Sequence, residues 1–144
     1  EFPAGEGIAE TVPVPVILTA FDSYQGTMNT IDLAIDVDAV FAEVCRMAWC
    51  HQSQICEWLP WVSAPERITP PKDEADWEAQ QRRRAAARNR RLGLADSRPR
   101  ERFSVTAWGR VPTPAELQRD LPGLDAGACD LGALERRLKS WRGD

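Results

Sequence analysis

The sequence predicts an α/β fold, with a few strands at about residues 14–20, 30–36 and 102–108 and several helices between and after them. Two observations carry this prediction. Short runs of β-branched or alternating apolar residues have the period of a strand, and longer segments repeat apolar residues at helical three- and four-residue steps. The chain has 144 residues, 43% of them hydrophobic, which is enough for a packed core and for one domain or less.

The first predicted strand covers the continuous apolar run from Val12 to Ala20, which is typical of a buried strand. Its two prolines lie in the first half, where a missing N–H is tolerated at a strand start or edge. The loop expected at 21–29 contains Asp22. Loops that follow strands often contact ligands, so Asp22 could touch a substrate; the alternative is an aspartate that forms a turn.

The second strand, at 30–36, alternates apolar and acidic side chains. A helix then follows in which apolar residues form one stripe: Val37, Val40, Phe41, Val44, Cys45 and Ala48. The stripe continues to His51, and the helix must end before Pro60 because proline cannot continue a helical hydrogen-bond ladder.

The second half of the chain begins with a proline-containing linker at 63–73. The next helix, 74–92, starts with acidic residues and ends with arginines, which suits the helix dipole. A short strand follows at 102–108, then a capping box at Thr113–Glu116 that opens a helix to Asp120, and a last helix at 130–141. We therefore divide the chain into a core part, 1–62, the linker, and a largely helical extension, 74–144.

Composition narrows the possible partners. A net charge of −4 gives no overall attraction to nucleic acid, and no apolar run approaches the roughly 18 residues of a membrane span. The cluster of arginines in 82–91 shares its helix with acidic residues, which favours a solvated, ion-paired helix over a phosphate site. Four cysteines at low density are typical of reduced thiols, so we expect a cytoplasmic location.

One stretch carries a family resemblance. Residues 46–62 read RMAWCHQSQICEWLPWV, and the pattern Ala48-x-x-His51-x-Ser53-Gln54 resembles a signature near the C-terminal end of PIG-L (LmbE-like) de-N-acetylases. The segments at 14–22, 32–38 and 102–117 are similar, in order, to other parts of one branch of that family. The resemblance covers about residues 10–122.

The resemblance implies the C-terminal portion of a Rossmann-like LmbE-type fold. It also implies a hydrolase that removes an N-acetyl group from a small sugar-like amine, with a divalent metal, usually zinc, and an aspartate base. In the family the metal ligands are two histidines and an aspartate, the first of them in an AHPDDE-type motif. This chain has His51 as its one histidine and no His-Pro-Asp sequence. We therefore expect no catalytic residue and no metal ligand in these 144 residues, and a chain that binds no zinc and is inactive alone.

The candidate substrate-binding residues are Gln54, which the resemblance favours, together with His51 and Asp22. Gln54 has an amide suited to a sugar hydroxyl or an acetyl oxygen, or it makes a structural hydrogen bond. His51 faces the active site, or it is a buried histidine hydrogen-bonded across the domain.

Two further groups have alternative interpretations. Four tryptophans could stack on a sugar or could pack in the core: Trp49, Trp58, Trp61 and Trp77. Cys45, Cys50, His51 and Cys56 lack zinc-site spacing, which argues against a metal there. The second function that we consider is a non-catalytic interaction protein derived from the same family, in which the basic helix and the tryptophans bind a partner.

Overall fold

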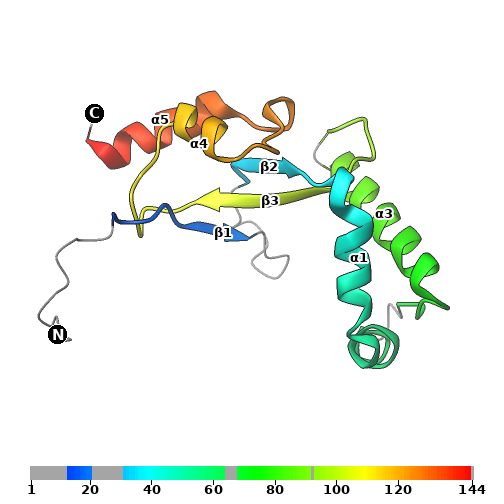
Figure 1. Ribbon diagram of the computed structural model, residues 1–144. Coiled ribbons are helices and arrows are strands. Elements are labelled where there is room, and N and C mark those ends of the chain that lie inside the picture. Colours follow the sequence, from blue (N-terminus) through cyan, green and yellow to red (C-terminus); the bar gives the residue numbers. More distant parts are fainter. Residues whose placement is uncertain (1–12, 21–30, 64–67, 92, 144) are drawn as a thin grey trace, which may run out of the picture.

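The computed structural model describes residues 13–20, 31–63, 68–91 and 93–143. These residues form two parts that differ in architecture (Figure 1). The sheet body consists of residues 13–20, 31–36 and 93–143, and the helical arm consists of residues 37–63 and 68–91. The prediction of a mixed α/β protein is confirmed at this level.

The sheet has three short strands, β1 (Leu18–Ala20), β2 (Leu33–Asp36) and β3 (Arg100–Val105). Their order is β1-β3-β2, and β3 pairs antiparallel with both neighbours. Leu18 lies opposite Val105, and Leu33 lies opposite Phe103. The central strand therefore comes from the second half of the chain and joins two strands from the first half.

The prediction of a buried strand over 14–20 is wrong for most of its length. Only Leu18–Ala20 forms a strand, it lies at an edge of the sheet, and Val14 is 61% exposed. The physical reason is the pair of prolines, because neither Pro13 nor Pro15 has an N–H to donate to a ladder. This segment contributes carbonyl groups instead: Thr106 N donates to Ile17 O at 3.1 Å, and Arg110 N donates to Pro15 O at 2.9 Å.

The close approach of these two segments explains why residue 109 is a glycine. A Cβ atom at this position would lie 2.2 Å from Pro15 O and 3.0 Å from a side-chain carbon of Ile17. No real Cβ tolerates such a contact with backbone, so a glycine is required where the two segments touch.

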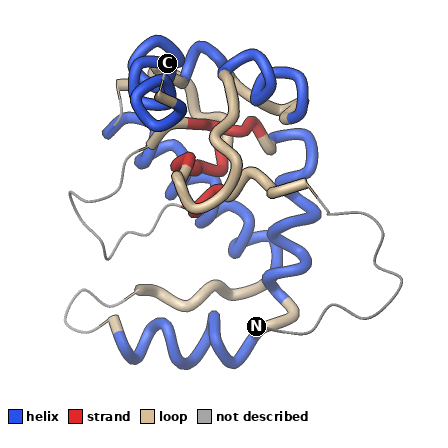
Figure 2. Tube along the Cα trace, turned by 90° about the vertical axis from the view of Figure 1, so that its left-hand side faces the viewer, coloured by secondary structure: helices blue, strands red, loops and turns tan. Residues whose placement is uncertain are grey.

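Three helical segments complete the body: α4 (Pro114–Asp120), η4 (Ala126–Ala128) and α5 (Leu131–Arg142). Helices α4 and α5 lie over one face of the sheet, and the arm projects from one end of it (Figure 1); Figure 2 shows the molecule turned by 90°. The core of the body is Leu33, Val105, Leu117, Leu134 and Leu138. The predicted capping box is confirmed, because Glu116 N donates to Thr113 Oγ1 at 3.2 Å and Thr113 N donates to Glu116 Oε2 at 2.8 Å.

The arm contains η2 (Asp38–Val40), α1 (Phe41–Trp49), η3 (Ser53–Trp58), α2 (Leu59–Val62) and α3 (Glu74–Arg91). Its small core consists of Phe41, Cys45, Ile55 and Trp77. Trp77 Nε1 donates to Cys45 O at 3.1 Å, which ties α3 to α1. Only Phe41 and Cys45 of the predicted apolar stripe are buried, whereas Val40 and Val44 are exposed.

Helical structure continues further toward the proline-containing linker than the sequence predicts. The helix α1 ends at Trp49, as expected before Pro60, but residues 52–62 are again helical and include Pro60. Residues Ser53–Trp58 form a π-helix, in which Leu59 N donates to Gln54 O. Proline lacks an N–H and its ring collides with the carbonyl four residues earlier, so a locally wider helix accommodates Pro60.

None of the helices in the described ranges combines the length and the apolar character that crossing a bilayer requires.

Candidate functional site

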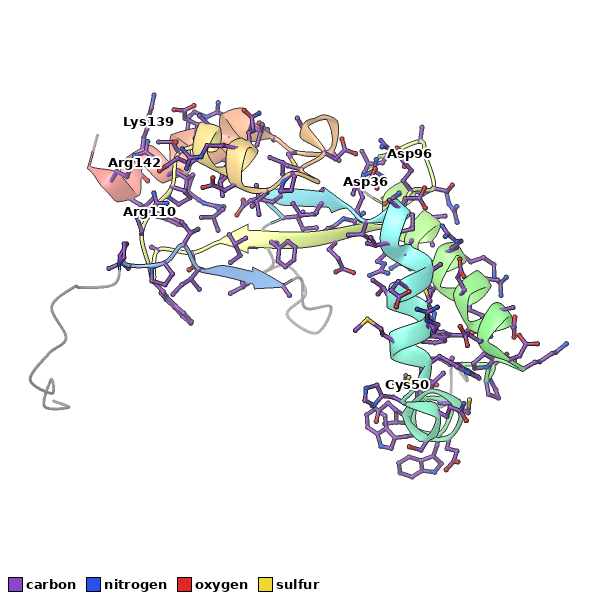
Figure 3. The ribbon with its side chains drawn as sticks, in the orientation of Figure 1. Asp36, Cys50, Asp96, Arg110, Lys139 and Arg142 are labelled. Carbon is purple, nitrogen blue, oxygen red and sulfur yellow. The ribbon has the colours of Figure 1, made fainter. Side chains whose placement is uncertain are left out.

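The arm ends in an open groove of about 540 Å³, lined by Ser53, Gln54, Glu57, Trp58 and Trp61. It belongs to η3 and α2, just after Cys50 at the far end of the arm (Figure 3). The lining residues recur in steps of four, 53-57-61 and 54-58. A helix that is wider than α keeps such steps closer to one face.

One residue of this segment anchors it to the arm. Ile55 is 5% exposed and packs in the arm core, and its N–H donates to His51 O at 3.0 Å. Cys56 also packs against this core, whereas Gln54, Glu57 and Trp58 are exposed. The groove is therefore the outer face of a helical segment whose inner face is held by the core of α1 and α3.

The groove combines aromatic surface with free polar groups. Trp58 is 48% exposed and Trp61 is 75% exposed. In the described part of the chain, the side chains of Ser53, Gln54 and Glu57 have no hydrogen-bond or ion-pair partner. Apolar walls with a few free polar groups are typical of small-molecule sites.

The three predicted substrate-binding residues have different outcomes. Gln54 lines the groove. His51 is exposed and lies in the turn before it, so the alternative of a buried, hydrogen-bonded histidine is wrong. The reason is the turn at Cys50–His51, which takes the side chain off the buried stripe of α1. Asp22 lies outside the described residues. The structure thus places Gln54 and His51 on one short segment.

Of the four tryptophans, two lie in or against the arm core and two are exposed at the groove. Trp77 is buried in the arm core, and Trp49 packs against that core. Trp58 and Trp61 are exposed at the groove. The sequence indicated both uses but not which tryptophan has which, because this depends on the π-helical turn before Pro60.

The described residues do not fit a zinc ion. No group of three or more His, Cys, Asp or Glu side chains among them is placed to hold a metal. Cys45 is buried, and burial raises the pKa of its thiol. The Cys50 thiol donates to Arg46 O at 3.7 Å, within its own helix. We therefore derive no chemical step through a metal from this chain.

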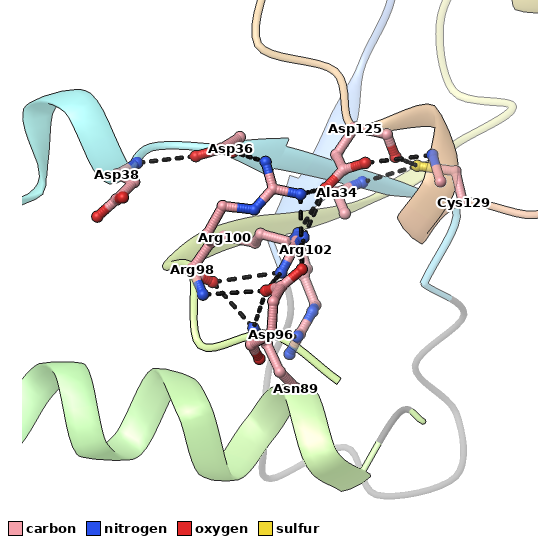
Figure 4. A network of polar contacts seen from close by, with 11 residues as sticks. Ala34, Asp36, Asp38, Asn89, Asp96, Arg98, Arg100, Arg102, Asp125 and Cys129 are labelled. Atoms are coloured by element: carbon pink, nitrogen blue, oxygen red, sulfur yellow. Dashed lines mark hydrogen bonds and ion pairs between the residues drawn. The ribbon is translucent and has the colours of Figure 1, made fainter. Parts of the chain in front are cut away.

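Sequence reasoning missed a polar network in the sheet body (Figure 4). Arg100, whose side chain is 2% exposed, donates to Asp96 at 2.6 and 2.7 Å and to Asp125 at 2.6 and 2.8 Å. Arg98 adds ion pairs to Asp36 at 2.7 Å and to Asp125 at 3.2 Å. The one signal in the sequence is the alternation Asp96-x-Arg98-x-Arg100, which does not reveal the distant partners.

Arg100 sets the electrostatics of this network. Its hydrogen bonds hold the pKa of Asp96 and that of Asp125 below the ordinary carboxyl range. The pKa of Arg100 is raised, first by Asp96 and then by Asp125, against the effect of burial. Both carboxylates are poor bases near neutral pH, and arginine nitrogens occupy their oxygens, so we assign this network a structural role.

A second buried arginine lies between the body and the arm. Arg102 Nη2 donates to Asn89 Oδ1 at 2.8 Å, and within the described chain its Nε has no hydrogen-bond partner. Burial lowers the pKa of Arg102, and the nearby positive charges of Arg88 and Arg100 lower it further. Asn89 also donates to Arg98 O at 2.9 Å, so one buried amide connects α3 to the start of β3.

Two arginines of the basic cluster of α3 make ion pairs. Arg82 pairs with Glu78 and with Asp38, both at 2.8 Å, and Arg83 pairs with Asp76 at 3.8 Å. For these two arginines the prediction of a solvated helix with ion pairs is confirmed.

In comparisons with known proteins, no family model, no curated protein and no solved structure matches this chain.

Proposed function

We propose that this chain is the ligand-contacting, C-terminal portion of a metal-dependent hydrolase that removes an N-acetyl group from a small sugar-like amine. The observation that carries the proposal is the groove at the end of the arm, which coincides with the segment that resembles the de-N-acetylases. The Rossmann-like LmbE-type fold and the cytoplasmic location belong to the same proposal.

The chemistry of the groove suits a sugar. The C–H face of a pyranose ring is apolar and stacks on an indole, and Trp58 and Trp61 offer two indoles. Hydroxyl and acetamido groups around such a ring both donate and accept hydrogen bonds. Gln54 offers two donors and an acceptor, Ser53 offers a hydroxyl, and Glu57 accepts.

In this proposal the metal ligands and the general base come from residues outside this chain. Within it, Gln54 orients the ligand by a hydrogen bond, and His51 positions the turn from which the groove segment starts. The 144-residue chain alone then binds a sugar weakly and hydrolyses nothing.

Tryptophan fluorescence tests the proposal directly. Titration of the chain with N-acetylglucosamine should change the emission of the exposed tryptophans in a saturable way, and Trp61→Ala should weaken this binding. The matched control is Trp108→Ala, because Trp108 is 84% exposed but lies outside the groove. Equal effects of the two substitutions, or no saturable signal in the unaltered chain, would reject the groove as a sugar site.

The second candidate is a non-catalytic interaction protein, and a strip of apolar side chains on α1 favours it. Val40, at the start of the helix, and Val44 and Met47 within it are all exposed at helical spacing. Exposed strips of this kind are typical of protein contacts. Sedimentation velocity over a range of concentrations distinguishes the candidates. Self-association that Val44→Lys abolishes, in a chain that binds no sugar, would favour this second function.

A further inference from the structure

We propose that the groove selects a protonated amine, so that it holds an amino sugar more tightly than the corresponding N-acetylated or neutral sugar. This inference rests on the proposed function and adds a ligand class to it, the deacetylated product type. Three observations support it. They concern the charge of the groove, its aromatic rings, and the comparison of an ammonium group with an acetamide.

The first observation is a carboxylate without a counter-charge among the described residues. Among the described residues that line the groove, Glu57 is the charged one, and within the described chain it has no ion-pair partner. Two other glutamates of the arm are paired: Glu43 pairs with Arg46, and Glu78 pairs with Arg82. A lone carboxylate beside apolar walls attracts a cation from solution more than a paired one does.

The second observation concerns the rings. Elsewhere in the molecule an arginine lies over an aromatic ring: Arg82 over Phe41 at 5.0 Å, Arg84 over Trp77 at 5.9 Å and Arg137 over Trp141 at 5.0 Å. Within the described chain, no cation lies over Trp58 or Trp61. Indole is the strongest neutral partner for a cation, and aromatic rings with a carboxylate are the usual way in which proteins bind ammonium groups.

The third observation is chemical. An acetamide is neutral, so it makes hydrogen bonds to Gln54 but leaves the Glu57 carboxylate without a counter-charge. An ammonium at the same position gains the ion pair with Glu57 and the cation–π contact with an indole. The groove thus makes more favourable interactions with the amine than with the amide, and the difference depends on Glu57.

The experiment compares three ligands on the full 144-residue chain: glucosamine, N-acetylglucosamine and glucose, by calorimetry at a pH where the amine is protonated. An exposed ion pair and a cation–π contact predict about twofold to fivefold tighter binding of glucosamine. Raising the salt concentration should reduce this preference. Glu57→Gln should abolish it, so that the variant binds glucosamine and N-acetylglucosamine with equal affinity.

A control variant is Glu101→Gln, which removes an exposed carboxylate on β3, away from the groove, and should keep the preference. Circular dichroism verifies that both variants are folded. Equal affinity for the amine and the acetamide would overturn this inference and leave the proposed function in place. Binding of glucosamine alone, dependent on Glu57, would support the inference and count against the N-acetylated substrate. No binding of any of the three sugars would overturn both.

Discussion

The sheet body and the helical arm differ in where they place charged and apolar groups. The body buries charge: Asp32, Arg100 and Arg102 are all in its interior, each hydrogen-bonded to a side chain or to backbone. The arm carries most of the exposed large apolar side chains, including Met47, Trp58 and Trp61, although Trp108 of the body is also exposed. The two parts thus differ in how they distribute charged and apolar groups.

This difference indicates separate roles. A buried polar network that is satisfied internally defines one arrangement of the segments it joins and leaves little free for a ligand. Exposed aromatic surface beside unpaired polar groups does not define such an arrangement, but it leaves groups free to contact a ligand. We therefore assign structural specificity to the body and ligand contact to the end of the arm.

The largest expected effect is on the network of the body. Arg100→Ala leaves the largely buried Asp125 without its main counter-charge, so we expect a loss of about 3 to 5 kcal/mol in the free energy of unfolding, measured by urea denaturation. The matched variant Arg98→Ala removes a half-exposed arginine and should cost about 1 kcal/mol or less. If the two variants were equally stable, burial of Arg100 would not be what makes the network important.

A smaller loss is expected where the edge segment meets the end of β3. Gly109→Ala forces a methyl group against Pro15 O, and overpacking of this kind costs about 1 to 3 kcal/mol. Gly132→Ala in α5 is the control, because its added Cβ would lie 3.6 Å from the nearest side-chain atom and alanine favours a helix. The control should be neutral or slightly stabilising; a loss as large as that of Gly109→Ala would contradict the close-contact explanation.

Acid should weaken the body through the same network. The pKa values of Asp96 and Asp125 are lowered in the folded chain, so the folded state binds protons less readily than the unfolded state. The stabilisation is therefore complete above the ordinary carboxyl pKa of about 3.9 and is lost as the pH falls below it. Thermal melts between about pH 5 and about pH 2.5 measure this loss. Asp96→Asn should show a shallower decline, and an unchanged slope would exclude Asp96 as a contributor.

The smallest effect is expected at the arm, and on binding instead of folding. Gln54→Ala should weaken binding of N-acetylglucosamine by roughly 0.5 to 1.5 kcal/mol, about twofold to tenfold in Kd. The thermal midpoint should be unchanged, because the described chain makes no structural hydrogen bond to this side chain. A lowered midpoint with normal binding would show that Gln54 belongs to the structure, and the comparison between arm and body would lose its main support.

The sequence by itself determined the elements that rest on local interactions. The helix at 74–91, the capping box at Thr113 and the final helix follow from periodicity, helix dipole and short-range hydrogen bonds, all within a few residues. It also located the segment that forms the groove, through Gln54 and the two tryptophans, although not their exposure.

Only the tertiary structure decides which residues that are far apart in the sequence come into contact. The antiparallel pairing of β3 between β1 and β2 depends on contacts far apart in the sequence. The network depends on Asp36, Asp96 and Asp125, which come from three separate segments. The local sequence around these aspartates does not mark them as partners of Arg98 and Arg100, because only folding brings the segments together. Likewise Pro60 predicts the end of a helix, whereas the structure has a π-helical segment before it, anchored to the arm core by Ile55.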